Sequence, residues 1–535
     1  MRKKNLISKS IGVILAAAMV VTSMTGCGGG NGNAGSSGSS GEAVSDGEVK
    51  KGGTLKFGLS TEPYTLDPMI GAGYGSKNVA LAIYEGLFKF DDEGNVQNAL
   101  CKDYSISKDG KTYTFTLTDA NFQNGDPVTA EDVKYSFERI MNKDAGAYYY
   151  SMMTKNVDKI EAKDDKTCVV TLKAPFQAFI NYLATKEMLI VSESWTEEHD
   201  GDISQEPMGA GPFKFVSWDS GVSIKLEANK DYYIPDQPYL DGIEFSFFAD
   251  ENARVNALET KSVDIIEYTP QSQFDTINGM KDLEVLEQPG PASYLIMNTK
   301  NKYLSDKKVR QAITYAINKQ DVLNAAFSGK GTILNGSPLT EDSLGYTKEQ
   351  AECYTQDVDK AKELLKEAGY PNGFKIKILT SSTYSFMEQT AVAVQSSLKE
   401  VGIDAEIESV EWSTFNQRSN AGECELATQA FLGDVMDPDW LNTMYAEGGG
   451  YNMAAYQSDK YDKLMKEGAA ESDESKRQKI YEKVVDVIMD DCPYAFLCYR
   501  SQGTSINKKV KGFKMIGGNA WPCQGVTLAY TWLDE

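Results

Sequence analysis

The stretch Tyr113–Arg139, which reads YTFTLTDANFQNGDPVTAEDVKYSFER, contains the pattern of a strand followed by the start of a helix. Apolar and polar residues alternate over Tyr113–Leu117, and this period of two predicts a strand. Thr129 is followed three residues later by Asp132, a spacing typical of the capping box that starts a helix. The apolar face of this helix is formed by Val133, Phe137 and Ile140.

Downstream of this stretch the chain alternates between helical and strand periods. Asp306–Phe327 carries apolar residues at helical spacing and predicts one helix. The other expected elements are a helix over 356–369, a strand over 374–379, a helix over 385–401, a strand over 405–410 and a helix over 412–420. Such alternation predicts an α/β fold.

Several blocks of the sequence resemble one known family. Tyr113–Arg139 is similar to the signature of the family 5 extracellular solute-binding proteins, the receptors of peptide and nickel ABC importers. Further similar blocks, in the order expected for the family, are Thr61–Pro68, Gly209–Trp218, Ala253–Leu258 and Val309–Ala312. The resemblance extends from Thr54 to the C-terminus. It implies an α/β, two-lobed periplasmic-binding-protein-like fold around a cleft.

The resemblance also implies a division into domains. Lobe I would comprise residues 51–84, 205–290 and 500–535, with an extra subdomain over 85–204, and lobe II would comprise 291–499. The chain would cross the hinge near Gln288–Tyr294 and again near Tyr499. In such a receptor, ligand binding shifts the population from the open to the closed arrangement of the lobes, and the transporter recognises the closed state.

The N-terminus predicts export and a lipid anchor. Three basic residues at 2–4 precede the apolar run Ile11–Val21, which is too short to span a membrane and is typical of a signal peptide over residues 1–26. Cys27 follows Thr25-Gly26 and resembles the diacylated cysteine of the bacterial lipobox, although Met24 replaces the usual leucine. Residues 27–50, rich in Gly and Ser, predict a flexible tether.

Composition narrows the class of partner. The formal net charge is −23, which argues against nucleic acid or anionic lipid as a ligand, because both need a basic surface. The chain has 29 tyrosines, 21 phenylalanines and 6 tryptophans, enough to line a cleft as well as a core. We expect a monomer that contacts the membrane only through its lipid.

The sequence does not indicate an enzyme. Its one histidine, His199, lies in an acidic stretch and is expected at the solvated surface, so no Ser/His/Asp or Cys/His set is evident. No cysteine belongs to a metal-binding motif, and we expect no metal and no cofactor. The seven cysteines after Cys27 are an odd number, and we expect buried free thiols.

The resemblance also suggests ligand-binding residues. In peptide-binding members an aspartate in a loop of lobe II pairs with the α-ammonium of the ligand, and the matching residue here is Asp434. The other candidates are Phe431, Gly433, Trp412, Tyr74 and Tyr499. A role in the core or on the surface stays open for these aromatic residues. Asp437, which precedes Pro438, is expected to cap a helix instead.

The chain departs from the dipeptide-binding pattern at one position. Those relatives place an arginine near the start of the helix over 385–401, and the nearest match here is Glu388. The preferred function is therefore an extracytoplasmic, membrane-anchored receptor that delivers peptides, in particular oligopeptides, to the permease of an ABC importer. The alternatives are a receptor for another solute, such as an oligosaccharide or a metal chelate, and an exported enzyme or adhesion protein.

Overall fold

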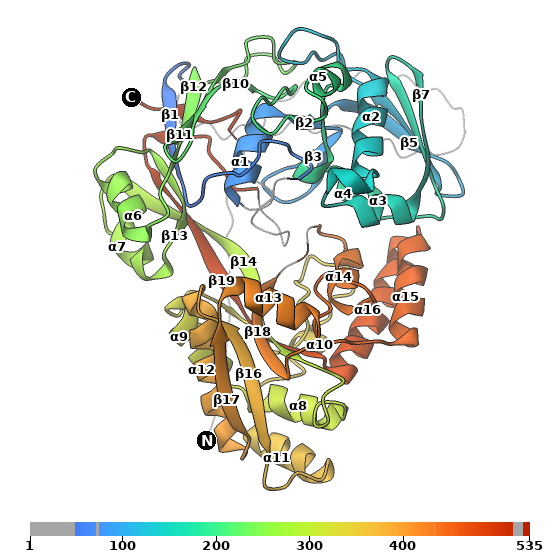
Figure 1. Cartoon of the computed structure of the whole chain (residues 1–535), viewed down its shortest axis with the longest axis vertical. Helices are drawn as coiled ribbons and strands as arrows, with labels where there is room; N and C mark the ends of the chain where they lie inside the picture. Colours follow the sequence, from blue (N-terminus) through green and yellow to red (C-terminus); the bar gives the residue numbers. More distant parts are fainter. Residues whose placement is uncertain (1–48, 71–73, 432, 434, 517–527) are drawn as a thin grey trace, which may run out of the picture. The chain divides into compact units, whose positions relative to one another are not determined.

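The computed structural model describes residues 49–70, 74–431, 433, 435–516 and 528–535. A large sheet of eleven strands runs through this part of the chain (Figure 1). Its order is β10-β11-β12-β1-β13-β19-β14-β18-β16-β17, with β15 beside β19. The strands are β1 (Thr54–Leu59), β10 (Phe213–Asp219), β11 (Ser223–Ala228), β12 (Gly242–Phe247), β13 (Ile265–Thr269), β14 (Leu283–Met297), β15 (Gly331–Ile333), β16 (Lys375–Ser381), β17 (Asp404–Val410), β18 (Leu426–Phe431) and β19 (Tyr494–Asn507).

The sheet is mixed, and two long antiparallel strands occupy its middle. β1 is parallel to β12 and β13, and β16 is parallel to β17 and β18, whereas β14 and β19 pair antiparallel from Leu283–Asn507 to Ile296–Tyr494. Their register is interrupted between Pro289 and Ala292. This interruption falls within the segment where the sequence predicts the first hinge crossing.

Tyr113–Arg139 forms the strand and the helix that its sequence predicts. β6 (Thr112–Leu117) belongs to a four-stranded sheet with β5 (Cys101–Ile106), β7 (Val157–Asp164) and β8 (Thr167–Leu172). α2 (Ala130–Ile140) starts at a complete capping box between Thr129 and Asp132. The apolar face of α2 is fully buried, which confirms the helix and its orientation.

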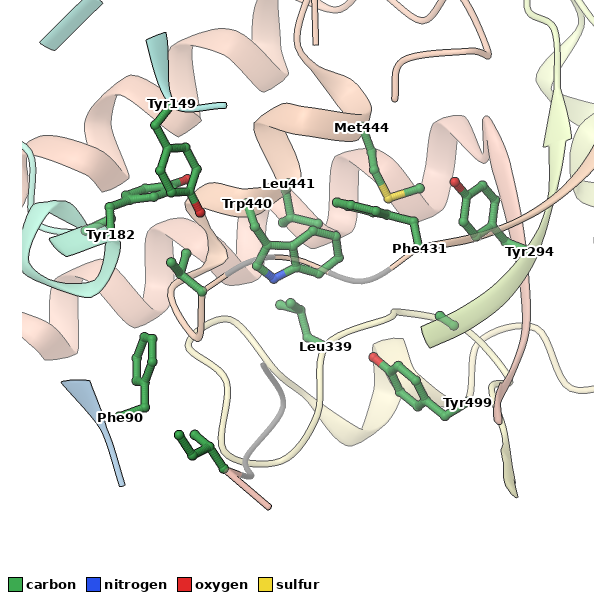
Figure 2. Close-up of a cluster of buried hydrophobic side chains, with 14 of the residues drawn as sticks. Phe90, Tyr149, Tyr182, Tyr294, Leu339, Phe431, Trp440, Leu441, Met444 and Tyr499 are labelled. Atoms are coloured by element: carbon green, nitrogen blue, oxygen red, sulfur yellow. The ribbon is translucent and has the colours of Figure 1, made fainter. Parts of the chain in front are cut away.

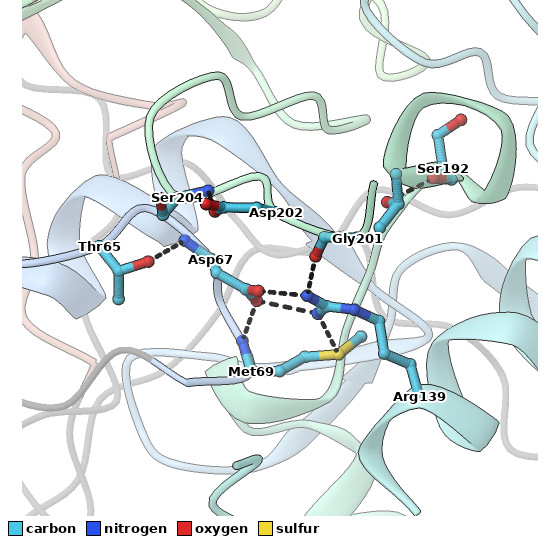
Figure 3. A network of polar contacts seen from close by, with 9 residues as sticks. Thr65, Asp67, Met69, Arg139, Ser192, Gly201, Asp202 and Ser204 are labelled. Carbon is cyan, nitrogen blue, oxygen red and sulfur yellow. Dashed lines mark hydrogen bonds and ion pairs between the residues drawn. The ribbon is translucent and has the colours of Figure 1, made fainter. Parts of the chain in front are cut away.

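A buried ion pair joins this stretch to the block Thr61–Pro68 (Figure 3). Arg139, near the end of α2, donates from both terminal nitrogens to the carboxylate of Asp67 and from Nη2 to the carbonyl of Gly201, at 3.0 Å. The backbone N–H of Met69 donates to the same carboxylate at 3.1 Å. Two blocks that are far apart in the sequence thus form one structural unit.

The predicted helix over Asp306–Phe327 is wrong as a single element. The structure has α8 (Lys307–Ala316) and α9 (Lys319–Phe327), separated by Ile317 in an extended conformation. Asn318 caps α9, because its side chain accepts hydrogen bonds from the N–H groups of Gln320 and Asp321, at 3.1 and 3.2 Å. The following elements match the predictions: α11 (Val358–Glu367), α12 (Ser385–Glu400) and α13 (Trp412–Asn420), with β16 and β17 between them.

Shorter elements complete the described part of the chain. The helices are α1 (Tyr74–Ile83), α3 (Tyr150–Asn156), α4 (Phe179–Leu183), α5 (Glu193–Glu198), α6 (Glu251–Glu259), α7 (Phe274–Asn278), α10 (Lys348–Ala351), α14 (Leu441–Tyr445), α15 (Asp459–Ala470) and α16 (Glu474–Asp491). The short strands are β2 (Glu85–Gly86), β3 (Phe88–Phe90), β4 (Val96–Asn98), β9 (Leu189–Ile190), β20 (Val510–Lys511) and β21 (Trp532–Leu533). Over the residues that the structure covers, we find no helix whose length and apolarity would let it cross a membrane.

The cysteines agree with the predicted free thiols as far as the structure covers them. Cys101, Cys168, Cys353, Cys424, Cys492 and Cys498 form no disulfide. Five of these are buried, and burial raises the pKa of the Cys101 thiol to about 12. Such thiols are weak nucleophiles. Cys523 and the proposed lipidation residue Cys27 lie outside the described residues.

Candidate functional site

Two of the predicted ligand-binding residues, Trp412 and Phe431, lie near the carboxyl ends of parallel strands. β16 and β17 are in register up to the pair Ser381–Val410, and β18 runs parallel beside β16. Trp412 lies two residues after the end of β17, and Phe431 is the last residue of β18. In open α/β sheets, ligands bind outside the carboxyl ends of the strands. The strand order therefore brings together residues from separate parts of the sequence.

Phe431 and Tyr499 lie in one row across the large sheet. Ala292 of β14 pairs with Phe431 on one side and with Tyr499 of β19 on the other. The Phe431 ring is buried and stacks on Tyr451 with 4.2 Å between ring centres, within the apolar cluster of Figure 2. The hydroxyl of Tyr499 donates to the carbonyl of Pro338. Each of the two rings is thus held by its own packing or hydrogen-bond partner.

Gly433 is required by the packing of the loop that follows β18. A Cβ at this position would lie 2.1 Å from Cγ of Trp440, so only glycine lets the backbone approach the indole. Trp440 is buried, and its ring lies 6.3 Å from that of Phe431 (Figure 2). Gly433 therefore packs directly against the Trp440 indole.

The C-terminal side of the same loop is fixed by a buried ion pair. Asp437 accepts the N–H of Asp439 at 3.0 Å, which confirms the predicted cap with Pro438 in the first helical turn. Its carboxylate also pairs with Arg477 of α16, with O–N distances of 2.6 and 2.9 Å. Arg477 lies 40 residues away in the sequence and is not among the predicted site residues. Asp434 itself lies outside the described residues.

Asp439 is a second buried carboxyl in this loop. It accepts hydrogen bonds from the Tyr182 hydroxyl, at 3.1 Å, and from the side-chain amide of Asn442, at 2.9 Å. Burial, and then the nearby charge of Asp437, raise the pKa of Asp439 to about 6. Tyr182 belongs to the predicted extra subdomain, so this hydrogen bond joins distant parts of the sequence.

The remaining candidates differ in their surroundings. The half-buried Trp412 ring stacks on Phe415 and meets Tyr384 edge to face, with ring centres 5.4 and 5.0 Å apart. Tyr384, which the sequence analysis missed, is 41% exposed. Tyr74 is the first residue of α1. The roles of Trp412 and Tyr74 in binding a ligand stay predictions.

The sequence predicts no metal site and a position for His199 at the solvated surface. Among the described residues, no three His, Cys, Asp or Glu side chains form a group that could hold a metal ion. The partly exposed His199 is held by the carbonyl of Trp195, at 2.7 Å, and by Glu206, at 3.1 Å. It lies at the end of α5, away from the strands that carry the candidate site.

Comparison with known proteins places this arrangement in a family. Residues 95–453 match the profile described as bacterial extracellular solute-binding proteins, family 5 Middle. Glutathione-binding protein GsiB of Pectobacterium atrosepticum is 32% identical over 464 residues, which cover 84% of this chain and 89% of that protein. Its namesake from Escherichia coli (strain K12) is 30% identical over the same shares of both chains.

Solved structures give the same result. The periplasmic binding protein AgaA from A. tumefaciens R10, in complex with agropinic acid, is 35% identical with a TM-score of 0.80, covering 90% of this chain and 99% of that one. DppA from Helicobacter pylori, in complex with the peptide STSA, is 30% identical with a TM-score of 0.78, covering 91% and 99%. The chain therefore belongs to the bacterial extracellular solute-binding proteins of family 5, which are receptors of ABC importers and not enzymes.

Proposed function

We propose that this receptor binds peptides, oligopeptides among them, and delivers them to the permease subunits of an ABC importer. The observation that carries the proposal is the construction of the loop after β18. In this loop, Gly433 packs against the Trp440 indole, and Asp437 forms an ion pair with Arg477. A loop held in this way can present one side chain in a constant position, which recognition of a fixed ligand group requires.

Asp434 is the side chain that we expect this loop to present. Every peptide with a free N-terminus offers an α-ammonium, whatever its sequence. A buried ammonium loses its water and needs a paired carboxylate to offset that loss. The peptide backbone and varied side chains can be accommodated by strand-like hydrogen bonds and by water. The aromatic residues Trp412, Tyr74 and Tyr499 would then line the path of the peptide.

The ligands of the relatives support a peptide more than the alternatives. GsiB is named for binding glutathione, and the structure of DppA is a complex with the peptide STSA. Each of these two ligands carries a free ammonium and a carboxylate. Agropinic acid, bound by AgaA, is the observation that favours a second candidate, a receptor for another small acidic solute. An oligosaccharide fits Asp434 less well, because a sugar has no cation to pair with it.

The cellular setting is part of the proposal. Cys27 would carry the lipid that holds the receptor at the outer face of the membrane, with residues 27–50 as a tether. We further propose a monomer with lobe I over 51–84, 205–290 and 500–535, an extra subdomain over 85–204 and lobe II over 291–499. The register interruption between Pro289 and Ala292 supports a boundary in that region.

Calorimetry with trialanine and N-acetyl-trialanine tests the role of Asp434. Asp434→Ala should lower the affinity for trialanine by about 3–5 kcal/mol, and acetylation should cause a comparable loss in the unmodified protein. In the Asp434→Ala variant, acetylation of the peptide should lower the affinity much less, since the carboxylate that would pair with the ammonium is already absent. Additive losses would move the proposal towards a ligand without an amine. Asp357→Ala, at the exposed cap of α11, is the control and should leave binding unchanged.

A further inference from the structure

Arg500 of β19 stands out among the described arginines because its guanidinium has no polar partner. The side chain is half-buried, and the guanidinium carbon lies 5.2 Å from the ring centre of Phe386, in the first turn of α12. No described residue forms an ion pair or hydrogen bond with it. By contrast, carboxylates or carbonyls bind the guanidinium groups of Arg139, Arg254, Arg310, Arg418 and Arg477. A guanidinium stays charged at any physiological pH, so Arg500 offers an unused cation.

A second unused polar group lies beside it on the same face of β19. Gln502 is only 3% exposed, yet neither its Oε1 nor its Nε2 has a hydrogen-bond partner among the described residues. A Cβ at Gly290 would lie 3.2 Å from Cγ of Arg500 and 3.2 Å from Cβ of Gln502. The two side chains therefore both lie next to Gly290, where β14 has no side chain. A buried amide without a partner destabilises a protein. Its presence next to an unpaired cation points to a ligand that satisfies both.

The surroundings of Arg500 belong to the candidate site. The Phe386 ring lies 6.0 Å from that of Tyr384, which in turn meets Trp412, the predicted wall of the site. α12 has 16 residues and no side chain that caps its first turn, so its N-terminal end favours negative charge. These features share one chemistry, the binding of an anion next to aromatic rings.

We propose that Arg500 and Gln502 receive a carboxylate of the ligand. The guanidinium fork can hold both oxygens of a carboxylate, and the amide N–H of Gln502 can donate to one of them. This inference rests on the proposed function and gives the peptide a second anchor besides Asp434. It also explains how the receptor does without an arginine at Glu388, since β19 supplies a cation next to Phe386 in the first turn of α12. The carboxylate can come from the C-terminus of a short peptide or from an acidic side chain of a longer one.

Calorimetry with three probes separates these sources. The probes are trialanine, its C-terminal amide, and Ala-Glu-Ala amide, each measured with the unmodified protein and with Arg500→Gln and Arg500→Lys. A charge-assisted hydrogen bond contributes enough for Arg500→Gln to weaken binding of a carboxylate ligand by about 10- to 100-fold. Arg500→Lys should recover part of that loss, because it keeps the charge and loses the fork. Arg418→Gln, which removes a cation paired with Glu408 at 2.8 Å, is the control.

The pattern across the probes decides the outcome. If trialanine alone loses affinity in Arg500→Gln, the C-terminus is the group bound; if Ala-Glu-Ala amide alone does, it is the acidic side chain. Equal losses for all three probes, or none, would overturn the inference while leaving the peptide function intact. If no peptide binds, the proposed peptide function is wrong. The role of Arg500 is then tested by measuring how Arg500→Gln changes the affinity for the solute that co-purifies. A co-purified solute without an acidic group, identified by mass spectrometry, would overturn the inference as well.

Gln502→Met distinguishes binding from a structural role. If Gln502 serves the ligand, the variant should raise the melting temperature of the ligand-free protein, because it removes an unsatisfied buried amide. It should also weaken binding of the carboxylate probe about 3- to 10-fold, as expected for one lost hydrogen bond. A fall in melting temperature together with unchanged affinity would assign Gln502 to the fold alone.

Discussion

Replacing Asp437 by alanine should destabilise the protein far more than the loss of an ordinary helix cap. The Asp437 carboxylate is buried, accepts hydrogen bonds from the N–H of Asp439 and from Nη2 of Arg477, and forms an ion pair with Nη1 of Arg477 at 2.6 Å. In the variant, Arg477 would keep its charge and retain only the Gly468 carbonyl, at 2.8 Å, and the Tyr481 hydroxyl, at 3.2 Å. A buried charge that loses its counter-ion is costly, because neither water nor a carboxylate replaces it.

The magnitude follows from these contacts. Breaking a buried ion pair by removing one partner costs about 3–5 kcal/mol, and an N-cap contributes about 1 kcal/mol. Asp437→Ala should therefore lower the free energy of unfolding by about 4 kcal/mol or more. Asp437→Asn keeps an acceptor for the N–H of Asp439 and should lose about 1 kcal/mol less. Adding Arg477→Met to Asp437→Ala should restore part of the loss, since no unpaired charge then remains.

Urea unfolding followed by tryptophan fluorescence and circular dichroism measures these differences. Asp357→Ala is the matched control, because Asp357 also caps a helix, accepting the N–H of Lys360 at 2.8 Å, but is exposed and has no ion pair among the described residues. The control should lose about 1 kcal/mol. Equal losses for Asp437→Ala and Asp357→Ala would refute the reasoning, since the ion pair with Arg477 would then contribute nothing.

Three further predictions concern the loop and the anchor. The pKa of Asp439 rises on folding from 3.8 to about 6, so the folded state binds the proton more tightly and loses stability as pH rises from about 4 to about 6. Asp439→Asn should remove about 3 kcal/mol of this pH dependence. An unchanged profile of melting temperature against pH in the variant would contradict this prediction. Gly433→Ala should force the Trp440 indole to move and lower stability by about 1–3 kcal/mol, whereas Gly450→Ala, where a Cβ meets no atom within 4 Å, should not; equal unfolding midpoints would argue against the clash. Cys27→Ala should leave the protein in the medium or as an unprocessed precursor, and a processed, membrane-bound variant on immunoblots of cell fractions would exclude the lipid anchor.

Local signals in the sequence predicted much of the fold. The capping box at Thr129 and the alternation over 374–420 each depend on neighbouring residues, and the structure confirms them. The division between α8 and α9 escaped prediction because the apolar spacing continues across it. That break is stabilised partly by a tertiary contact, in which the N–H of Asn318 donates to the Ser397 hydroxyl at 3.1 Å. Such contacts leave no mark on the local pattern.

The candidate site was predictable only in part for the same reason. Resemblance to a family identified the loop after β18, and a proline identified Asp437 as a cap. The partner Arg477 comes from a helix that begins well after this loop, and only the packing reveals it. The neighbourhood of Gly290, Arg500 and Gln502 depends on the register of β14 and β19. Neither residue type nor spacing indicates that these residues meet.

The strand order of the large sheet also determines when the chain can fold. β13 and β14 follow each other in the sequence, yet they are not neighbours in the sheet. β19 lies between them and pairs with β13 on one side and with β14 on the other. The two halves of the sheet therefore cannot be joined before residues 494–507 have been synthesised. Pairings between such distant segments form slowly, because the intervening chain must first be ordered. Until these residues pair, the part of the sheet that contains β1, β12 and β13 and the part that contains β14, β16, β17 and β18 remain separate.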